Sequence, residues 1–143
     1  MDYVGFAVIS AIAAGSYSVL QRMTAPAINQ AFGALLISIT AATISLVILL
    51  LTRNERPLYT DSRVFPLIAL IGLTAFSVDF FSLLAYSRGL SVSVGAPISV
   101  GVSIATASIA GFAMGESVTA PKLVGIALII VGALFLGTTP MTK

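Results

Sequence analysis

The chain has 143 residues, of which 58% are hydrophobic and 8% charged, with a net charge of +2 and a mean hydropathy of +1.10. Soluble domains typically carry about 25% charged residues, so this composition excludes an ordinary water-facing surface. The chain has no cysteine and no histidine, which excludes disulfides, thiolate metal sites and histidine-based zinc or haem sites. We therefore expect no metal and no cofactor. The few basic residues lie between or after the apolar runs and do not indicate nucleic-acid binding.

Five apolar runs fill the chain almost from end to end. Each is close to the ~17–25 apolar residues that a helix needs to cross a bilayer. In hydrocarbon only helices and closed barrels satisfy the backbone, and these runs are too long and lack the two-residue alternation of barrel strands. The sequence predicts an all-α integral membrane protein, with residues 1–143 as one domain of five transmembrane helices at about 3–20, 31–52, 64–86, 92–114 and 123–137.

The polar breaks between the runs contain residues that start and end helices. Asn29 is a candidate cap for the second helix, Asp61 or Ser62 for the third and Thr119 for the fifth. Gly89 suits the left-handed position that follows a helix. Because the breaks are short, we expect consecutive helices to be antiparallel neighbours.

The basic residues of the breaks specify orientation only weakly. An odd number of crossings places the two ends of the chain on opposite sides of the membrane. One side would hold four basic residues and the other three, a difference of 4 − 3 = 1: Arg53, Arg56, Arg63 and Lys122 against Arg22, Arg88 and Lys143. The positive-inside rule requires a clearer asymmetry. A single orientation with a cytoplasmic N-terminus and dual topology with both orientations are both open.

Asp79 is the one acidic residue well inside an apolar run. Intramembrane carboxylates are costly and usually face the bundle interior. Helical spacing places Ser82, Leu83 and Tyr86 on the same stripe. Asp79 is therefore a candidate proton-coupling or cation-binding group. The alternative is a structural carboxylate that pairs with Arg22 or Arg88, or reaches interfacial water.

The first and fourth helices carry further candidates. Tyr17 and Gln21 lie on one stripe of the first helix, and either line a cavity or belong to an interfacial aromatic belt. Ser99 and Ser103 form a small, hydroxylated stripe on the fourth helix, in which Pro97 permits a bend. Close helix packing is the favoured interpretation of that stripe, and a ligand-binding lining is the other.

Two pairs of glycines indicate close packing between helices. Gly111 and Gly115 form a G-x-x-x-G pattern, and Gly125 and Gly132 are seven residues apart on one face of the last helix. Either pair is a candidate seam within the bundle or toward a second chain.

The C-terminal half resembles a known family. Residues 85–99 (AYSRGLSVSVGAPIS), 115–119 (GESVT) and 125–132 (GIALIIVG) are similar, in order and spacing, to EamA-type domains of the drug/metabolite transporter superfamily. The last helix also resembles the dimerisation seam of the small multidrug resistance branch. That branch depends on a glutamate in its first helix, and here the first helix contains no acidic residue, so its mechanism does not carry over.

The resemblance implies a transporter built from one five-helix repeat, where most members have two inverted repeats. Such repeats bind substrate near the bilayer midplane, at their interface, and an antiparallel homodimer would recreate that arrangement. We expect a secondary transporter of a small metabolite or amphiphile in the cytoplasmic membrane. Its substrate site would comprise Tyr17, Gln21, Asp79, Ser82, Tyr86, Pro97, Ser99 and Ser103. The alternative is a non-transporting subunit that assembles with or regulates another membrane protein. An enzyme is not expected, because no catalytic constellation is present.

Overall fold

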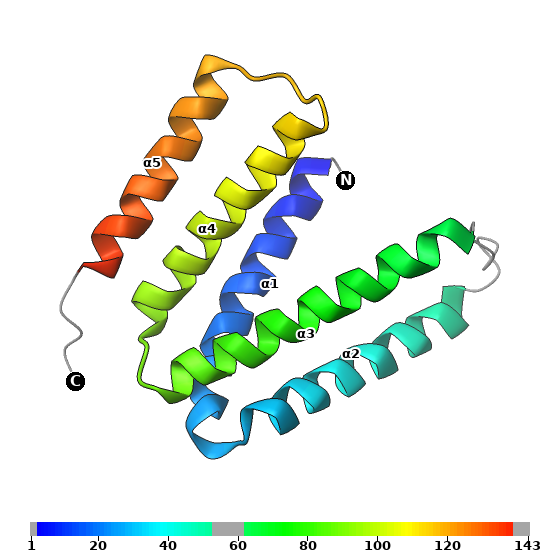
Figure 1. Cartoon of the computed structure of the whole chain (residues 1–143). Helices are drawn as coiled ribbons and strands as arrows, with labels where there is room; N and C mark the ends of the chain where they lie inside the picture. Colours follow the sequence, from blue (N-terminus) through cyan, green and yellow to red (C-terminus); the bar gives the residue numbers. More distant parts are fainter. Residues whose placement is uncertain (1–2, 53–61, 139–143) are drawn as a thin grey trace. The chain divides into compact units, whose positions relative to one another are not determined.

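In a computed structural model, residues 3–52 and 62–138 form helices joined by turns, without a strand in either range. The elements are α1 (Tyr3–Thr24), η1 (Ala25–Ala27), α2 (Gln30–Thr52), η2 (Ser62–Val64), α3 (Phe65–Ser87), α4 (Val92–Ala113) and α5 (Ala120–Gly137) (Figure 1). All five α-helices are long and apolar enough to cross a membrane. The predicted all-α membrane fold and its five helices are confirmed.

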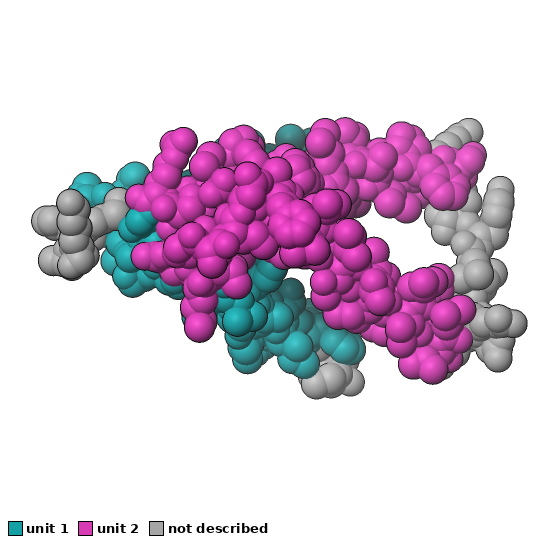
Figure 2. All heavy atoms as spheres, turned by 90° about the horizontal axis from the view of Figure 1, so that it is seen from below, with its two compact units in different colours: residues 1–20, 89–143 teal, residues 21–88 magenta. Residues whose placement is uncertain are grey.

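The chain divides into two compact units, coloured separately in Figure 2. The first contains residues 1–20 and 89–143, and the second contains residues 21–88. Each unit is described by itself below. The expectation that all five helices form one domain stays a prediction.

In the unit of residues 21–88, α2 and α3 pack against each other and η1 packs against α3. The two helices run antiparallel, as expected (Figure 1). Their contact is close at Gly33 of α2, which has no side chain to separate the helices. A Cβ added there would lie 2.8 Å from Cδ1 of Leu83, a fully buried leucine. Pro26 lies inside η1, where the direction of the chain changes after α1.

In the unit of residues 1–20 and 89–143, α4 packs antiparallel against α5 (Figure 1). The contact is made by small residues. A Cβ on Gly101 would lie 2.7 Å from the Cβ of Ala133, and one on Gly137 would lie 3.5 Å from Cδ1 of Ile98. This close approach is typical of membrane helices, whose association depends on van der Waals packing.

The helix ends confirm some predicted caps and correct others. Asn29 caps α2, because its side-chain oxygen accepts from the backbone N–H groups of Ala31 at 3.0 Å and Phe32 at 3.3 Å. Gly89 has the expected positive φ of +98°. Thr119 is the N-cap of α5 by position, but its side chain makes no capping hydrogen bond.

The prediction that Ser62 caps α3 is wrong. A 3₁₀ turn that begins at Ser62 precedes the helix, and Val64 occupies the cap position. Asp61, the other candidate, lies outside the described residues. The helix boundaries also differ by a few residues. α1 continues to Thr24 and α5 begins at Ala120, since polar residues and Pro121 are tolerated in terminal helical turns.

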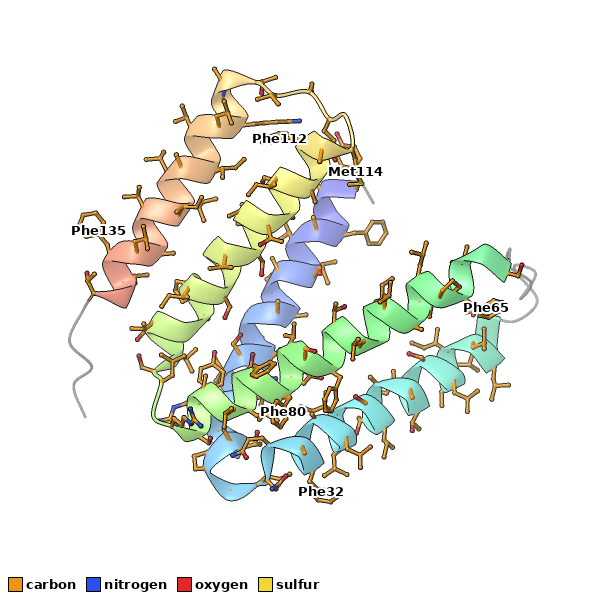
Figure 3. All side chains as sticks on the ribbon, in the orientation of Figure 1. Phe32, Phe65, Phe80, Phe112, Met114 and Phe135 are labelled. Carbon is orange, nitrogen blue, oxygen red and sulfur yellow. The ribbon has the colours of Figure 1, made fainter. Side chains whose placement is uncertain are left out.

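The large apolar side chains face outward, the reverse of a soluble protein. Leu51 is 81% exposed and Phe135 is 71% exposed. In Figure 3, Phe135 projects from the outer side of α5, away from α4. These surfaces are suited to contact with the hydrocarbon of a bilayer, because apolar side chains in lipid carry no hydration cost.

Candidate functional site at the end of α1 and on α3

Two polar side chains are buried against each other in the unit of residues 21–88. Gln21, near the end of α1, donates from Nε2 to Oδ1 of Asp79 on α3 at 3.4 Å. Gln21 is 4% exposed and Asp79 is 8% exposed. This pair joins two helices across 58 residues of sequence. A buried polar pair in a chain with so few polar side chains is the strongest candidate for function.

The pattern of α3 explains why Asp79 is buried. Asp79, Leu83 and Tyr86 are the buried residues of this helix, and their spacing of four and three places them on one stripe. Ser82, which the sequence places on the same stripe, is half-buried. Phe81 lies on another side and is 63% exposed. The predicted inward stripe of α3 is therefore confirmed.

The end of α1 is fixed locally. Thr24 donates from its hydroxyl to the carbonyl of Gln21 at 3.2 Å, and the fully buried Ala25 begins η1. These contacts position the last helical turn that carries Gln21. The amide then reaches α3 from a defined backbone, as a binding group needs.

Asp79 lies within the span of α3. It precedes the last residue of α3, Ser87, by eight positions, which corresponds to about 12 Å along the axis at 1.5 Å per residue. Charged or polar groups at this depth are expensive in lipid unless they are paired or face water. The hydrogen bond from Gln21 supplies one such pairing.

The other candidates lie in the unit of residues 1–20 and 89–143. Tyr17 and Pro97 are half-buried, whereas Ser99 and Ser103 are exposed. The Ser103 hydroxyl donates to the Ser99 carbonyl at 2.7 Å, a bond within α4 itself. The structure therefore brings Gln21 and Asp79 together, and Ser82 and Tyr86 lie on the same stripe of α3 as Asp79. A joint site with the four residues of α1 and α4 stays a prediction.

The predicted glycine seams have a different basis in the structure. Gly111 is covered by the carboxylate of Glu116, whose atoms lie 3.0–3.2 Å from an added Cβ. Gly115 has a φ of +91° and lies in the turn after α4. A Cβ on Gly125 or Gly132 would meet nothing within 4 Å. The α4–α5 contact of Gly101 with Ala133, which the glycine patterns did not identify, joins these helices instead. A role of the predicted glycines toward a second chain stays a prediction.

Glu116 closes the turn after α4 through its backbone. Its N–H donates to the carbonyl of Gly111 at 3.0 Å, and the N–H of Gly115 donates to the carbonyl of Phe112 at 3.1 Å. This pair of bonds, with the left-handed glycine between them, is a Schellman motif. The turn therefore needs a glycine at position 115, followed by a residue whose N–H is free to bond back to the helix, as in Gly115-Glu116.

Each unit also contains an apolar groove. One, of about 450 Å³, lies along α4 and α5 and includes Gly101, Thr106 and Ala133. The other, also about 450 Å³, includes Gly33, Thr40 and Leu83. Within residues 3–52 and 62–138, no group of three or more acidic, histidine or cysteine residues could hold a metal ion.

The comparison with known proteins agrees with this architecture. No curated protein and no solved structure matches the chain. The model of the EamA-like transporter family matches residues 2–138, which is nearly the whole sequence and covers all five helices. The family resemblance seen in residues 85–132 thus extends over residues 2–138. The chain is a multi-pass membrane protein that belongs to the EamA-like transporter family.

Proposed function

We propose that the protein is a secondary transporter that moves a small metabolite or amphiphilic compound by alternating access. The observation that carries the proposal is the buried hydrogen bond between Gln21 and Asp79 inside the span of α3. Family membership supports transport of small compounds in general. The buried pair supports a specific location for substrate or proton binding.

In this proposal Asp79 exchanges a proton or binds the cationic group of a substrate. An amide suits either role as the partner of a carboxylate. Gln21 has two N–H donors for an ionised carboxylate and a carbonyl oxygen that can accept from a protonated one. Rotation of the amide satisfies both states of Asp79.

The remaining candidates have supporting roles. Tyr86, which is 4% exposed, and Tyr17 would stack on the substrate, since aromatic faces bind apolar and cationic groups. Ser82, Ser99 and Ser103 would offer hydroxyls. Pro97, inside α4, would permit the helix to bend between two states, because proline removes a backbone hydrogen bond.

We further propose that two chains pair antiparallel in the cytoplasmic membrane. Five helices correspond to one repeat of a fold whose inverted repeats bind substrate at their interface. The near balance of basic residues, four against three, is what insertion in both orientations requires. A single cysteine at exposed Ser117 tests this point, since the sequence has no cysteine of its own. Labelling from both sides of the cell membrane is expected; labelling from one side only would contradict the antiparallel dimer.

Transport itself is tested with the purified protein. A thermal-shift screen of metabolites and amphiphilic amines identifies a ligand, and proteoliposomes then measure its counterflow under a pH gradient. Asp79→Asn should reduce proton-driven uptake to the level of empty liposomes. The matched control is Thr74→Val on the same helix, because Thr74 is exposed and its hydroxyl bonds to its own helix. Unchanged uptake in Asp79→Asn would remove the coupling role. Obligate co-purification with a different membrane protein, without counterflow, would favour a non-transporting subunit.

A further inference from the structure

A second pocket lies at the turn between α4 and α5, apart from the Gln21–Asp79 pair. It has a volume of about 370 Å³ and contains one carboxylate, Glu116, and one ammonium, Lys122. The rest of its lining is mostly apolar and includes Phe112, Ile126 and Ile129, together with Ser108. Phe112 lies near the turn, on the side of α4 that faces α5 (Figure 3).

The two charges of this pocket are held apart by local structure. The Glu116 carboxylate lies over Gly111. The Lys122 ammonium donates to the backbone carbonyl of Ser117 at 3.1 Å. Among the described residues no ion pair joins the two side chains. Each charge therefore remains available to an opposite charge on a ligand.

The electrostatics at the start of α5 also favour a bound anion. A lysine in the first helical turn is electrostatically disfavoured, because the N-terminus of a helix carries partial positive charge. α5 has no acidic residue in its first turn and no side-chain cap. A phosphate beside Lys122 would compensate both the ammonium and the helix terminus.

The pocket lies at one end of α4 and α5, and the ends of membrane-spanning helices are the parts that reach the lipid headgroups. α4 ends at Ala113 and α5 begins at Ala120, so the turn is at the end of two membrane spans. The apolar walls continue from the charged rim along α5 through Ile126 to Ile129. This order, with two opposite charges at the rim and an apolar wall beneath them, matches a phospholipid with an amine headgroup.

We propose that this pocket binds a zwitterionic aminophospholipid of the phosphatidylethanolamine type. Lys122 and the start of α5 contact the phosphate, Glu116 accepts N–H bonds from the headgroup ammonium, and an acyl chain lies along Ile126 and Ile129. A quaternary ammonium cannot donate such bonds, so phosphatidylcholine should bind more weakly. The site goes beyond the proposed transport function and does not depend on it.

Native mass spectrometry of the full chain, titrated with defined phospholipids, tests the proposal. Phosphatidylethanolamine should be retained more strongly than phosphatidylcholine or phosphatidylglycerol. Glu116→Gln and Lys122→Gln should each weaken its binding by about tenfold, the factor for loss of one hydrogen bond to a charged group. Arg88→Gln, which removes an exposed charge at a different turn, is the matched control and should change nothing.

Two further variants separate the site from a general loss of structure. Glu116→Gln is nearly isosteric and keeps the backbone bonds of the turn, so its thermal unfolding should be unchanged. Gly111→Ala keeps both charges, but its Cβ would crowd the Glu116 carboxylate at 3.0–3.2 Å, so it should also weaken phosphatidylethanolamine binding.

Several results would overturn the proposal. Equal retention of the three lipids would show that the pocket does not read the headgroup. Loss of binding in Lys122→Gln without an effect of Glu116→Gln would show a site for phosphate alone. Glycerophosphoethanolamine, the headgroup without acyl chains, should bind far more weakly than the lipid; equal affinity would assign the pocket to a free metabolite.

Discussion

Each of the two units contains a hairpin of apolar helices, but different contacts stabilise the two hairpins. In residues 21–88, a buried amide and a buried carboxylate lie beside a core that contains Leu83 and Tyr86. In the other unit, α4 and α5 meet through small residues such as Gly101 and Ala133. The first unit concentrates polarity at one internal point, and the second relies on close approach of two backbones.

This difference separates contacts that only stabilise a membrane protein from contacts that have a functional role. Small-residue contacts stabilise helices in lipid without any polar cost. A buried carboxylate adds a cost that packing alone does not require. The unit with the costly pair is therefore the better place to seek chemistry, and the unit with the small residues is the better place to seek assembly.

Removal of the Gln21 amide should have the largest effect. Gln21→Leu deprives the buried Asp79 carboxylate of a donor, and loss of one partner of a buried hydrogen bond costs about 1–3 kcal/mol, or more for a charged group. We expect a lower midpoint of thermal unfolding in detergent and loss of transport. Ser103→Ala, in the other unit, removes an exposed hydroxyl that donates to the Ser99 carbonyl within α4, and should change stability by less than about 0.5 kcal/mol. An equal drop of the unfolding midpoint in the two variants would contradict the difference between the units.

The two glycine contacts should differ in their tolerance of a methyl group. At Gly101 the added Cβ meets the Cβ of Ala133, which cannot move without the backbone, whereas at Gly33 it meets the flexible end of Leu83. Gly101→Ala should cost about 1–3 kcal/mol, the range for overpacking, and Gly33→Ala should cost less. Equilibrium unfolding in mixed micelles measures both. Ala133→Gly should restore much of the loss in Gly101→Ala, and a failure to do so would place the strain elsewhere.

The sequence predicts the helices well because the bilayer requires each spanning helix to be apolar and of a certain length. The predicted ranges fall within a few residues of the observed ones, and Asn29, Gly89 and the inward stripe of Asp79 are confirmed. The contact of Asp79 with Gln21 was not predictable. Gln21 lies 58 residues away, and spacing within one helix does not identify a contact with another.

The glycines show the same limit. A G-x-x-x-G pattern predicts close packing, yet Gly111 accommodates the Glu116 side chain and Gly115 has a left-handed φ in a turn. The real contact pairs Gly101 with Ala133, and neither residue belongs to a predicted seam. Spacing along one helix reports which residues share a face, but not which faces meet.

Helix capping provides a smaller contrast between the hairpins. Asn29 accepts hydrogen bonds from two backbone N–H groups at the start of α2, whereas Thr119 makes no such bond at the start of α5. Asn29→Ala should lower the free energy of unfolding by about 1 kcal/mol, and Thr119→Ala by less than half of that. Equilibrium unfolding in mixed micelles measures the free energy of unfolding of both variants. A larger loss in Thr119→Ala would mean that its side chain gains a partner, such as a lipid phosphate, in the membrane.

Gly132, an exposed glycine of α5, should give the smallest effect on the isolated chain and the most direct test of assembly. A Cβ on Gly132 meets nothing within 4 Å, and Gly132 is exposed, so Gly132→Ala should change monomer stability by less than about 0.5 kcal/mol. If Gly132 instead packs against a second chain, the added methyl group separates the two helices and weakens the dimer. Single-molecule photobleaching in liposomes measures the dimer fraction. Gly5→Ala, at another glycine with open surroundings on α1, is the control. A lower dimer fraction in Gly132→Ala alone would place the interface on α5. An unchanged dimer fraction would remove Gly132 from the interface.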